Sequence, residues 1–462
     1  MLKKIFKELL PAIRGDEKEF TKGSIRRAIF MLSVPMILEM IMEALFAVVD
    51  IFFVAQISTD AVATVGVTES VITLVYAMAI GISMAATAMV GRRIGEEDHE
   101  GAAIASMQAI FLGIFVSTIL GIGGFLFAED LLRLMGLKEE LIAQNVSYTR
   151  IIFSTNIVIT LLFLLNAIFR GAGDASLAMR SLWIANGLNI ILDPIFIFGL
   201  GPIPEMGIAG AAIATSIGRG SGVIFQLYIL LRGRGIIRIL RRHLQLQWHI
   251  IGRLLRVSLG GTGQHIIASA SWIFLMRIIA LFGEDVLAGY TIAIRVIIFC
   301  VLPCWGMSNA AATLVSQNLG AQQADRAEQS VWRTAQYNMY FLLAISVLFY
   351  LAAPQVLALF TTEEAVVEAG VLSLRIICLG YVFFAYGMVI SQAFNGAGDT
   401  VTPTVINFFC FWMVEIPLAY ILAVVLDWGP SGVYWTIAIS ESLLALLCIL
   451  LFRQGRWKKT TI

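Results

Sequence analysis

The chain has 462 residues, of which 59% are hydrophobic and only 14% are charged, and its formal net charge is +1. Soluble domains carry roughly 25% charged residues, so this composition excludes an ordinary soluble protein and predicts a membrane protein. The near-zero net charge gives no sign of a nucleic-acid partner, and we expect none. Five cysteines fall in apolar stretches without the further ligands of a metal site, which predicts reduced structural thiols; they are Cys300, Cys304, Cys378, Cys410 and Cys448.

The N-terminal segment 1–27 mixes charged side chains around a short amphipathic piece at 5–10. No apolar core followed by a small-residue cleavage site occurs there, so the pattern does not predict a signal peptide. We expect instead a helix on the membrane surface before the first span.

Twelve windows are long and apolar enough to span a bilayer, for which roughly 20 residues are needed. We therefore expect an all-α membrane protein with twelve transmembrane helices, and the even number puts both termini on one side. The windows cover residues 29–55, 62–90, 103–126, 142–168, 177–200, 207–231, 251–282, 287–316, 331–352, 365–393, 402–426 and 432–452.

Lys and Arg crowd the side of the termini, whereas the opposite loops offer only Arg133 and Lys138. Cytoplasmic loops carry the excess of Lys and Arg, so we expect both termini in the cytoplasm of a bacterial or archaeal inner membrane. The residues that decide this include Lys3, Lys4, Lys7, Arg14, Lys18, Lys22, Arg26 and Arg27, the central run Arg232, Arg234, Arg238, Arg241 and Arg242, and Arg453, Arg456, Lys458 and Lys459 near the C-terminus.

The strongest internal signal is a repeat that relates the two halves of the chain at one constant offset. FRGAGD at 169–174 matches FNGAGD at 394–399, and Gly81, Gly95 and Arg150 match Gly306, Gly320 and Arg375 at the same offset. Six helices therefore repeat as six helices, which is the duplicated architecture of many secondary transporters. The expected division is a cytoplasmic segment 1–27, a first lobe 28–231, a basic linker 232–249, a second lobe 250–453 and a tail 454–462.

The first span carries three acids on one stripe. At 100° per residue, Glu39, Glu43 and Asp50 fall within about 40° of one another. Ionisable residues inside spans are costly and usually face a cavity or a partner. We expect a cation-binding face, the alternative being carboxylates capped by neighbouring helices. Pro35 lies at the edge of the stripe and removes a backbone donor, so we expect a hinge there.

The fifth span reads ANGLNIILDPIF. Asn189 and Asp193 share a face, with Asn186 one turn earlier, and Pro194 frees a backbone carbonyl. These hard oxygen ligands suit a proton or Na⁺; a proline kink with a capped aspartate is the alternative.

In the fourth span, Tyr148 and Asn166 are separated by a whole number of helical turns, so we expect them to share a face. Spacing alone leaves simple packing open for this pair.

The second lobe has lost these acids. At the same offset, the positions of Asp50, Asp193, Asn189 and Glu39 hold Leu275, Leu418, Val414 and Gln264. The cation site is therefore expected in the first lobe. The second lobe has scattered ionisable residues that we expect to be paired or near helix ends, except Glu415, which Pro417 follows; they are His265, Arg277, Arg295, Glu415 and Glu441.

Several motifs together resemble the multidrug and toxic compound extrusion family over nearly the whole chain from about Gly23. They are Val34, Pro35, Val49 and Asp50 in the first span, GISMAATAMVGRRIGE at 81–96, both GAGD turns, Asn189 with Asp193 and Pro194, and GIAGAAIAT at 207–215.

The resemblance implies a V-shaped pair of six-helix lobes that alternates between inward and outward openings. It implies a cation site at Asp50, Asn189, Asp193 and Thr215 that holds H⁺ or Na⁺. It also implies a substrate cavity near Tyr148 and Asn166, to which the acidic stripe and the fifth span add Glu43 and Asn186. Glu43 departs from the family branch, which often has an uncharged polar residue there. The second-lobe acids that another branch uses for Na⁺ are also missing, which leaves the coupling ion open.

We therefore expect a monomeric antiporter that exports organic, often cationic, compounds without a cofactor. Asp50 and Asp193 would hold either the coupling ion or the drug, and ion binding would bend the first helix at Pro35. A lipid-linked oligosaccharide flippase of the same superfamily is the alternative, although it should have a more cationic cavity. A channel would not need two homologous lobes. No HExxH or GxSxG motif points to an enzyme, and GRGSG at 218–222 and GGTG at 260–263 are typical of helix packing.

The orientation is directly testable. A cysteine introduced at 232–249 should react with a membrane-impermeant reagent only from the cytoplasmic side, because Lys and Arg crowd that side. Labelling from the periplasm of intact cells would overturn the predicted topology.

Overall fold

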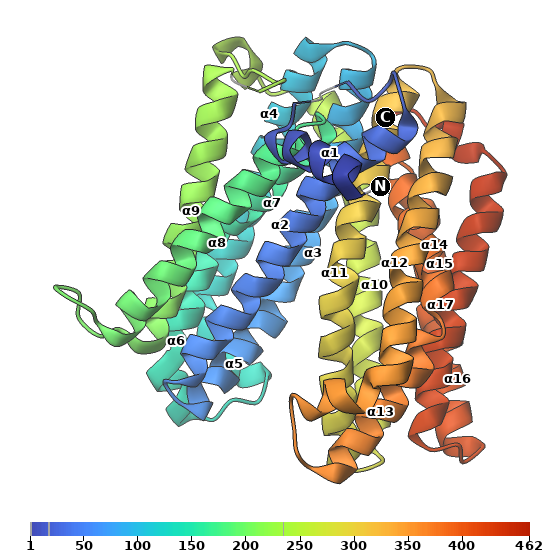
Figure 1. Cartoon of the computed structure of the whole chain (residues 1–462). Coiled ribbons are helices and arrows are strands. Elements are labelled where there is room, and N and C mark those ends of the chain that lie inside the picture. Colours follow the sequence, from blue (N-terminus) through green and yellow to red (C-terminus); the bar gives the residue numbers. More distant parts are fainter. Residues whose placement is uncertain (1, 17–18, 234) are drawn as a thin grey trace.

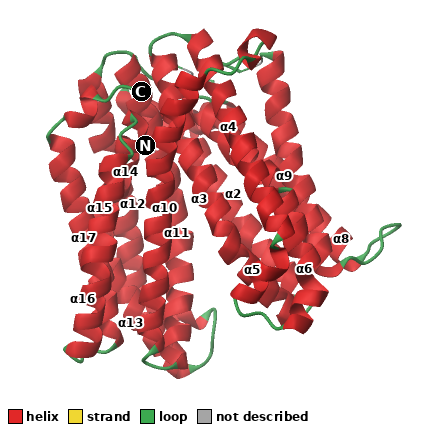
Figure 2. Ribbon diagram, turned by 180° about the vertical axis from the view of Figure 1, so that it is seen from behind, coloured by secondary structure: helices red, strands yellow, loops and turns green. Residues whose placement is uncertain are grey.

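The computed structural model describes residues 2–16, 19–233 and 235–462, and this part of the chain is helical without strands (Figure 2). Lys18 and Arg234, which were counted among the basic residues, lie outside the described residues. The expected surface helix is present as α1 (Leu2–Arg14), which lies across the end of the molecule that carries both termini (Figure 1).

The first lobe contains helices α2 to α9. Their bounds are α2 Ile25–Ala55, α3 Thr59–Gly95, α4 His99–Leu126, α5 Ala128–Leu134, α6 Glu139–Ser154, α7 Asn156–Gly171, α8 Ala175–Phe198 and α9 Gly207–Arg232.

The second lobe contains helices α10 to α17, and a short 3₁₀ turn, Arg241–Leu244, lies in the connection that precedes it. The bounds are α10 Trp248–Ala280, α11 Glu284–Gly320, α12 Ala324–Ala358, α13 Glu364–Cys378, α14 Tyr381–Ala397, α15 Val401–Asn407, α16 Ile416–Tyr420 and α17 Pro430–Arg453, and a last 3₁₀ turn covers Arg456–Lys459.

The helices match the twelve expected spans. Nine segments of the described chain are long and apolar enough to cross a membrane as they stand, and the bent pairs α6–α7 and α13–α14 raise the number to eleven. α2 is the remaining span, and it carries the acidic stripe. The chain is thus a multi-pass membrane protein with twelve transmembrane helices in two lobes.

Two spans that the sequence predicted as continuous are broken. α6 and α7 meet at 40° and α13 and α14 meet at 59°. The breaks fall at Thr155 and Gly380, which are related by the constant offset of the repeat. The same register relates the left-handed residues Gly173 and Gly398, with φ of 90° and 88°. The backbone therefore repeats even where the side chains do not.

The eleventh span departs from a regular α-helix. Between α15 and α16 the segment Phe408–Glu415 winds as a π-helix, and Ile421–Val425 does so again after α16. Pro417 lies between the two segments and has no N–H to donate to the preceding turn. A wider winding is a common adjustment at such a point and often marks a functional position.

The two lobes meet at the end that carries the termini and diverge toward the other end (Figures 1 and 2). Glycines allow the close approach. A Cβ atom on Gly95 of α3 would overlap the carbonyl of Gln317, and one on Gly320 of α11 would overlap the carbonyl of Arg92. Gln317 and Arg92 are themselves related by the repeat offset, so the two glycine contacts between α3 and α11 are reciprocal.

A second pair of crossings lies deeper in the molecule. Gly81 of α3 packs against α10 at Ser258 and Gly261, and Gly306 of α11 packs against the carbonyl of Met36 in α2. The first helix of each lobe therefore contacts the second helix of the other lobe, and these contacts close one end of the V.

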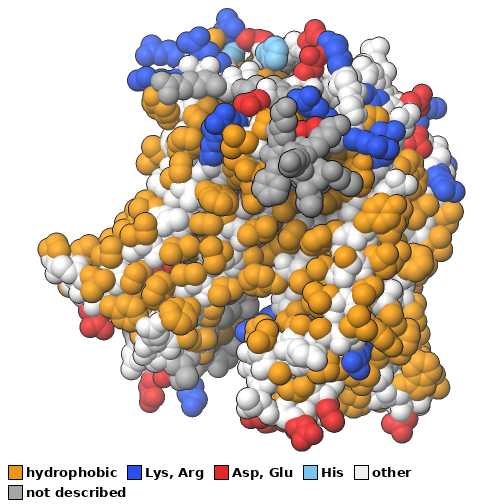
Figure 3. Space-filling view, in the orientation of Figure 1, with side chains coloured by type: hydrophobic (Ala, Val, Ile, Leu, Met, Phe, Trp, Pro, Cys, Tyr) orange, Lys and Arg blue, Asp and Glu red, His pale blue; other side chains and the backbone are white. Residues whose placement is uncertain are grey.

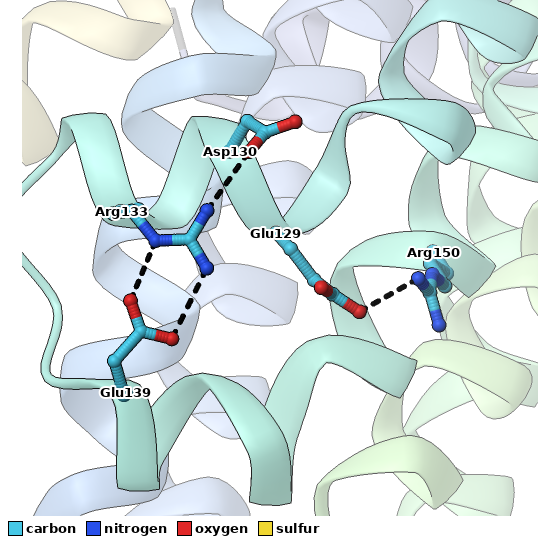
Figure 4. Close-up of polar contacts among 5 residues, drawn as sticks. All are labelled: Glu129, Asp130, Arg133, Glu139 and Arg150. Carbon is cyan, nitrogen blue, oxygen red and sulfur yellow. Dashed lines mark hydrogen bonds and ion pairs between the residues drawn. The ribbon is translucent and has the colours of Figure 1, made fainter.

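The surface has the layering of a membrane protein. Hydrophobic side chains cover the middle of the molecule, while Lys and Arg gather at the end with the termini, and the opposite end is hollowed between the lobes (Figure 3). At the tip of the first lobe, Arg133 bridges Asp130 on α5 and Glu139 on α6, and Arg150 contacts Glu129 (Figure 4). Exposed pairs of this kind contribute little to stability, but they orient α5 on α6.

The glycine crossings predict the effect of one methyl group. Gly95→Ala should weaken the closed end, because the new Cβ meets backbone atoms that cannot rotate away. Spin labels at His99 and Gln329 should report longer distances between the lobes in the variant. Gly66→Ala on the same helix is the matched control, since a Cβ there meets nothing within 4 Å. An unchanged distance distribution in Gly95→Ala would contradict this account of the closed end.

Candidate functional site

A cavity lies between the two lobes. The first lobe lines it with charged groups and the second lobe with amides. Its polar lining includes Glu39, Glu43, Asn166, Arg170, Asn309, Gln392 and Asn395, and its apolar lining includes Met40, Phe163, Leu302 and Trp305.

The first ion pair of the cavity joins α2 to the last turn of α7. The Glu39 carboxylate lies 2.7 Å from the Arg170 guanidinium and accepts a hydrogen bond of 3.1 Å from the Asn166 amide. Asn166 in turn accepts a hydrogen bond from Gln226 of α9. Glu39 is 1% exposed, so its charge is neutralised locally by Arg170.

The second ion pair lies one turn further along α2. Glu43 is 2.9 Å from Arg219 of α9, and its other oxygen accepts a 2.9 Å hydrogen bond from Asn186 of α8. Arg219 is 2% exposed. Its guanidinium lies 4.9 Å from the ring centroid of Phe46 and 5.9 Å from that of Phe163, which adds cation–π attraction to the ion pair.

These pairs correct the interpretation of the acidic stripe. Glu39 and Glu43 were expected to form a cation-binding face together with Asp50, but each is already paired with an arginine. Arg219 was missed, because GRGSG was interpreted only as a packing motif. The packing is real: a Cβ on Gly218 would lie 2.7 Å from the Ala185 carbonyl. The available signal was the arginine itself within an otherwise apolar span.

The expected cation site lies on the facing sides of α8 and α9, next to α2. The Asn189 amide donates to Asp193 at 3.1 Å and to Thr215 at 3.2 Å. Asp193 is fully buried, and its carboxylate lies within electrostatic range of Asp50. Asp50 is only partly buried and makes no hydrogen bond to any described residue. The structure therefore brings all four residues of the predicted site into one region.

Two buried oxygens of this cluster have no hydrogen-bond partner among the described residues. They are Oδ2 of Asp193 and Oδ1 of Asn189. Unsatisfied buried acceptors are costly, and a proton on Asp193 would relieve one of them directly. Na⁺ also fits the donor set of carboxylate, amide and hydroxyl oxygens, provided that Asn189 turns its amide oxygen toward Asp193. The oxygen atoms present therefore suit either ion chemically.

Tyr148 and Asn166 do not share a face as expected. The 40° break at Thr155 separates them, since Tyr148 belongs to α6 and Asn166 to α7. Tyr148 packs in an apolar cluster with Val54 and Ile197, although it remains within electrostatic range of Asp50 and Asp193. Asn166 lines the central cavity. The spacing argument assumed an uninterrupted helix.

Pro35 is buried within α2, which is one uninterrupted helix through that position. It lies immediately before Met36, whose carbonyl packs against Gly306 of α11. The residue expected to act as a hinge is thus next to a crossing between the lobes.

The second lobe replaces the first ion pair with amides. Gln264 and Asn395 occupy the positions that Glu39 and Arg170 occupy in the first lobe, and they exchange hydrogen bonds of 2.9 and 3.2 Å. Leu444 occupies the position of Arg219. The two walls of the cavity use matching positions of the repeat. The first-lobe wall is ionic, and the second-lobe wall is neutral.

Comparison with known proteins agrees with this duplicated architecture. The MatE family pattern matches the chain twice, at residues 35–195 and 263–421. The chain belongs to the MatE family. The starts of the two matches, at positions 35 and 263, are separated by nearly the repeat offset found in the sequence, and each match covers most of one MatE lobe.

Curated relatives of this MatE chain align along nearly its whole length. It is 26% identical over 459 residues to the probable multidrug resistance protein NorM of Thermotoga maritima, covering 99% of this chain and 97% of that protein. It is 26% identical over 446 residues to the probable multidrug resistance protein YoeA of Bacillus subtilis, covering 96% of each.

Solved MATE structures superpose on it closely. An outward-facing multidrug resistance MATE transporter of the MOP superfamily matches with a TM-score of 0.89 at 27% identity, covering 96% of this chain and 99% of that one. A MOP superfamily transporter from Pyrococcus furiosus, described as having a binding pocket of reverse polarity, matches with a TM-score of 0.88 at 27% identity, covering 96% and 98%.

The buried ion pair between Glu43 and Arg219 can be tested by stability. Arg219→Leu, which installs the residue of the second lobe, should destabilise the MatE fold by about 3–5 kcal/mol because it leaves a buried carboxylate unpaired. Adding Glu43→Gln should recover most of that loss. The unfolding temperature of purified protein measures both effects.

Arg253→Leu is the matched control for this pair, since Arg253 is exposed on α10. If the double variant were no more stable than Arg219→Leu, the pairing would not account for the loss.

Proposed function

We propose that this protein is a secondary active antiporter that exports organic compounds, often cationic, in exchange for H⁺ or Na⁺. The observation that carries the proposal is the cluster of Asp50, Asn189, Asp193 and Thr215 in the first lobe. This cluster contains buried oxygens that have no hydrogen-bond partner among the described residues. Relatives described as multidrug resistance proteins along almost the full chain support the substrate class.

The exchange follows from electrostatics. Asp50 and Asp193 lie within electrostatic range of each other in an apolar lobe, where two ionised carboxylates are unfavourable unless a cation joins them. A proton, Na⁺ or a cationic substrate each relieves this repulsion, so ion and substrate compete for the same negative charge. Binding of either therefore lowers the affinity for the other, as linkage requires.

The shape of the molecule supports alternating access. The cavity is closed by the glycine crossings at the end with the termini, and the lobes diverge at the opposite end (Figure 1). With both termini in the cytoplasm, this arrangement is an outward-open state. Ion entry from outside then discharges the substrate, and the lobes reclose around the empty site.

A flippase for lipid-linked oligosaccharides fits the cavity less well. A pyrophosphate group needs a surplus of positive charge, whereas Arg170 and Arg219 are each neutralised by a glutamate. The second-lobe wall contributes the neutral amides of Gln392 and Asn395, which add no positive charge. The charges of the cavity therefore favour export of organic cations over lipid-linked sugars.

Everted vesicles provide the deciding experiment. A fluorescent organic cation should accumulate when a proton gradient or a Na⁺ gradient is imposed separately, and the effective gradient identifies the coupling ion. Asp50→Asn and Asp193→Asn should each abolish accumulation, while Glu415→Gln should retain most of it, since it lies in the lobe that has no counterpart of Asp50 and Asp193. If Asp50→Asn were active and Glu415→Gln inactive, the coupling site would belong to the second lobe, and its assignment to the first lobe would be wrong.

Pro35 should control the rate of the conformational change. Pro35→Ala restores a backbone hydrogen bond in α2 and should slow turnover more than it weakens substrate binding. Dye affinity of purified protein and the transport rate in vesicles measure the two effects. A large loss of affinity at an unchanged rate would show that Pro35 shapes the site and does not act as a hinge.

A further inference from the structure

A second cavity lies inside the second lobe, away from the carboxylates that the proposed exchange uses. It is bounded by α10, α11, α14 and α17, and its walls are apolar and aromatic, including Trp272, Tyr381 and Phe384. Leu302 and Trp305 of α11 line both this cavity and the central one. The two spaces are therefore neighbours, separated by one layer of side chains.

Two polar groups of the cavity lack partners. Glu441 of α17 lines it and makes no hydrogen bond or ion pair with any described residue. Tyr381 is 3% exposed, and its hydroxyl also has no hydrogen-bond partner within the described part of the chain. Buried polar groups are normally satisfied, and the hydroxyl of Tyr381 is not. Glu441, which is partly buried, adds an unpaired carboxylate to the same apolar cavity, so the two groups together point to a ligand.

Among the described residues, the surroundings of Glu441 add negative charge and no compensating cation. Glu415, which is 3% exposed, lies within electrostatic range of Glu441 and accepts a 2.9 Å hydrogen bond from Ser440. Ser440 precedes Glu441 in α17, so Glu415 contacts the helical turn that carries Glu441. Only Glu441 faces the cavity. A positively charged ligand would offset the cost of this partly buried carboxylate.

We propose that the second-lobe cavity is a binding subsite for lipophilic organic cations, with Glu441 as the counter-charge and the aromatic walls as the apolar surface. Aromatic faces attract cations as well as apolar groups. A neutral acyl chain would fill the apolar walls but leave Glu441 uncompensated. The proposal rests on the proposed export function for its substrate class and names a place where such a substrate binds outside the first lobe.

The test is binding of tetraphenylphosphonium to the purified full-length protein by equilibrium dialysis, with uncharged triphenylphosphine oxide as the neutral probe. The wild type should bind the cation more tightly than the oxide. Glu441→Gln should weaken binding of the cation about tenfold or more, as expected for loss of a charged partner, and should leave binding of the oxide unchanged. Glu441→Asp should retain part of the affinity.

Matched variants locate the effect. Glu364→Gln, an exposed position in the same lobe, should leave both affinities unchanged. Phe384→Ala, which removes an aromatic wall and keeps the charge, should weaken both probes, and it provides a second readout if Glu441→Gln does not fold. Equal affinity of the cation for wild type and Glu441→Gln, or equal affinity of the wild type for both probes, would overturn the proposal.

This result can be separated from the proposed function. Asp50→Asn should abolish gradient-driven export yet keep the Glu441-dependent binding. If vesicles show no export with any gradient while the binding remains, the exchange proposal fails and the subsite stands. If export proceeds normally and Glu441→Gln binds the cation like the wild type, the subsite fails alone.

Discussion

The close approach of two backbones at glycines is the constraint on which the architecture depends. Gly95 and Gly320 place α3 and α11 against carbonyls of the opposite lobe, and a methyl group at either position would separate them. Because these two glycine contacts are reciprocal, a single contact geometry is used twice about a pseudo-two-fold axis. Closing one end in this way leaves the other ends of the long helices free to diverge, and the cavity between the lobes follows from that divergence.

Duplication fixed the backbone, whereas the side chains assign different tasks to the two lobes. The pair Glu39 and Arg170 is repeated as Gln264 and Asn395, with the same reach and without charge. The first-lobe wall therefore carries a neutralised ion pair, while the second-lobe wall offers hydrogen bonds from neutral amides.

Much of this could be predicted from the sequence, since hydropathy sets the spans and a constant offset sets the repeat. The grouping of Asp50, Asn189 and Asp193 also followed from helical spacing and family resemblance. The ion pairs did not, because Glu43 and Arg219 lie in the first and last spans of their lobe and no local pattern reports a partner so far along the chain. The break at Thr155 was missed as well: an apolar run gives no sign of a bend, and Tyr148 was consequently assigned to the wrong face.

The two buried ion pairs have an electrical consequence. Arg170 neutralises the charge of Glu39, and Arg219 neutralises that of Glu43. Among these cavity groups and the cluster of Asp50, Asn189, Asp193 and Thr215, the uncompensated negative charge therefore belongs to Asp50 and Asp193. Moving one elementary charge through the membrane potential changes the free energy by about 2.3 kcal/mol per 100 mV. Voltage therefore acts on the form in which these two carboxylates are ionised, and it does not act on the form in which protons neutralise them.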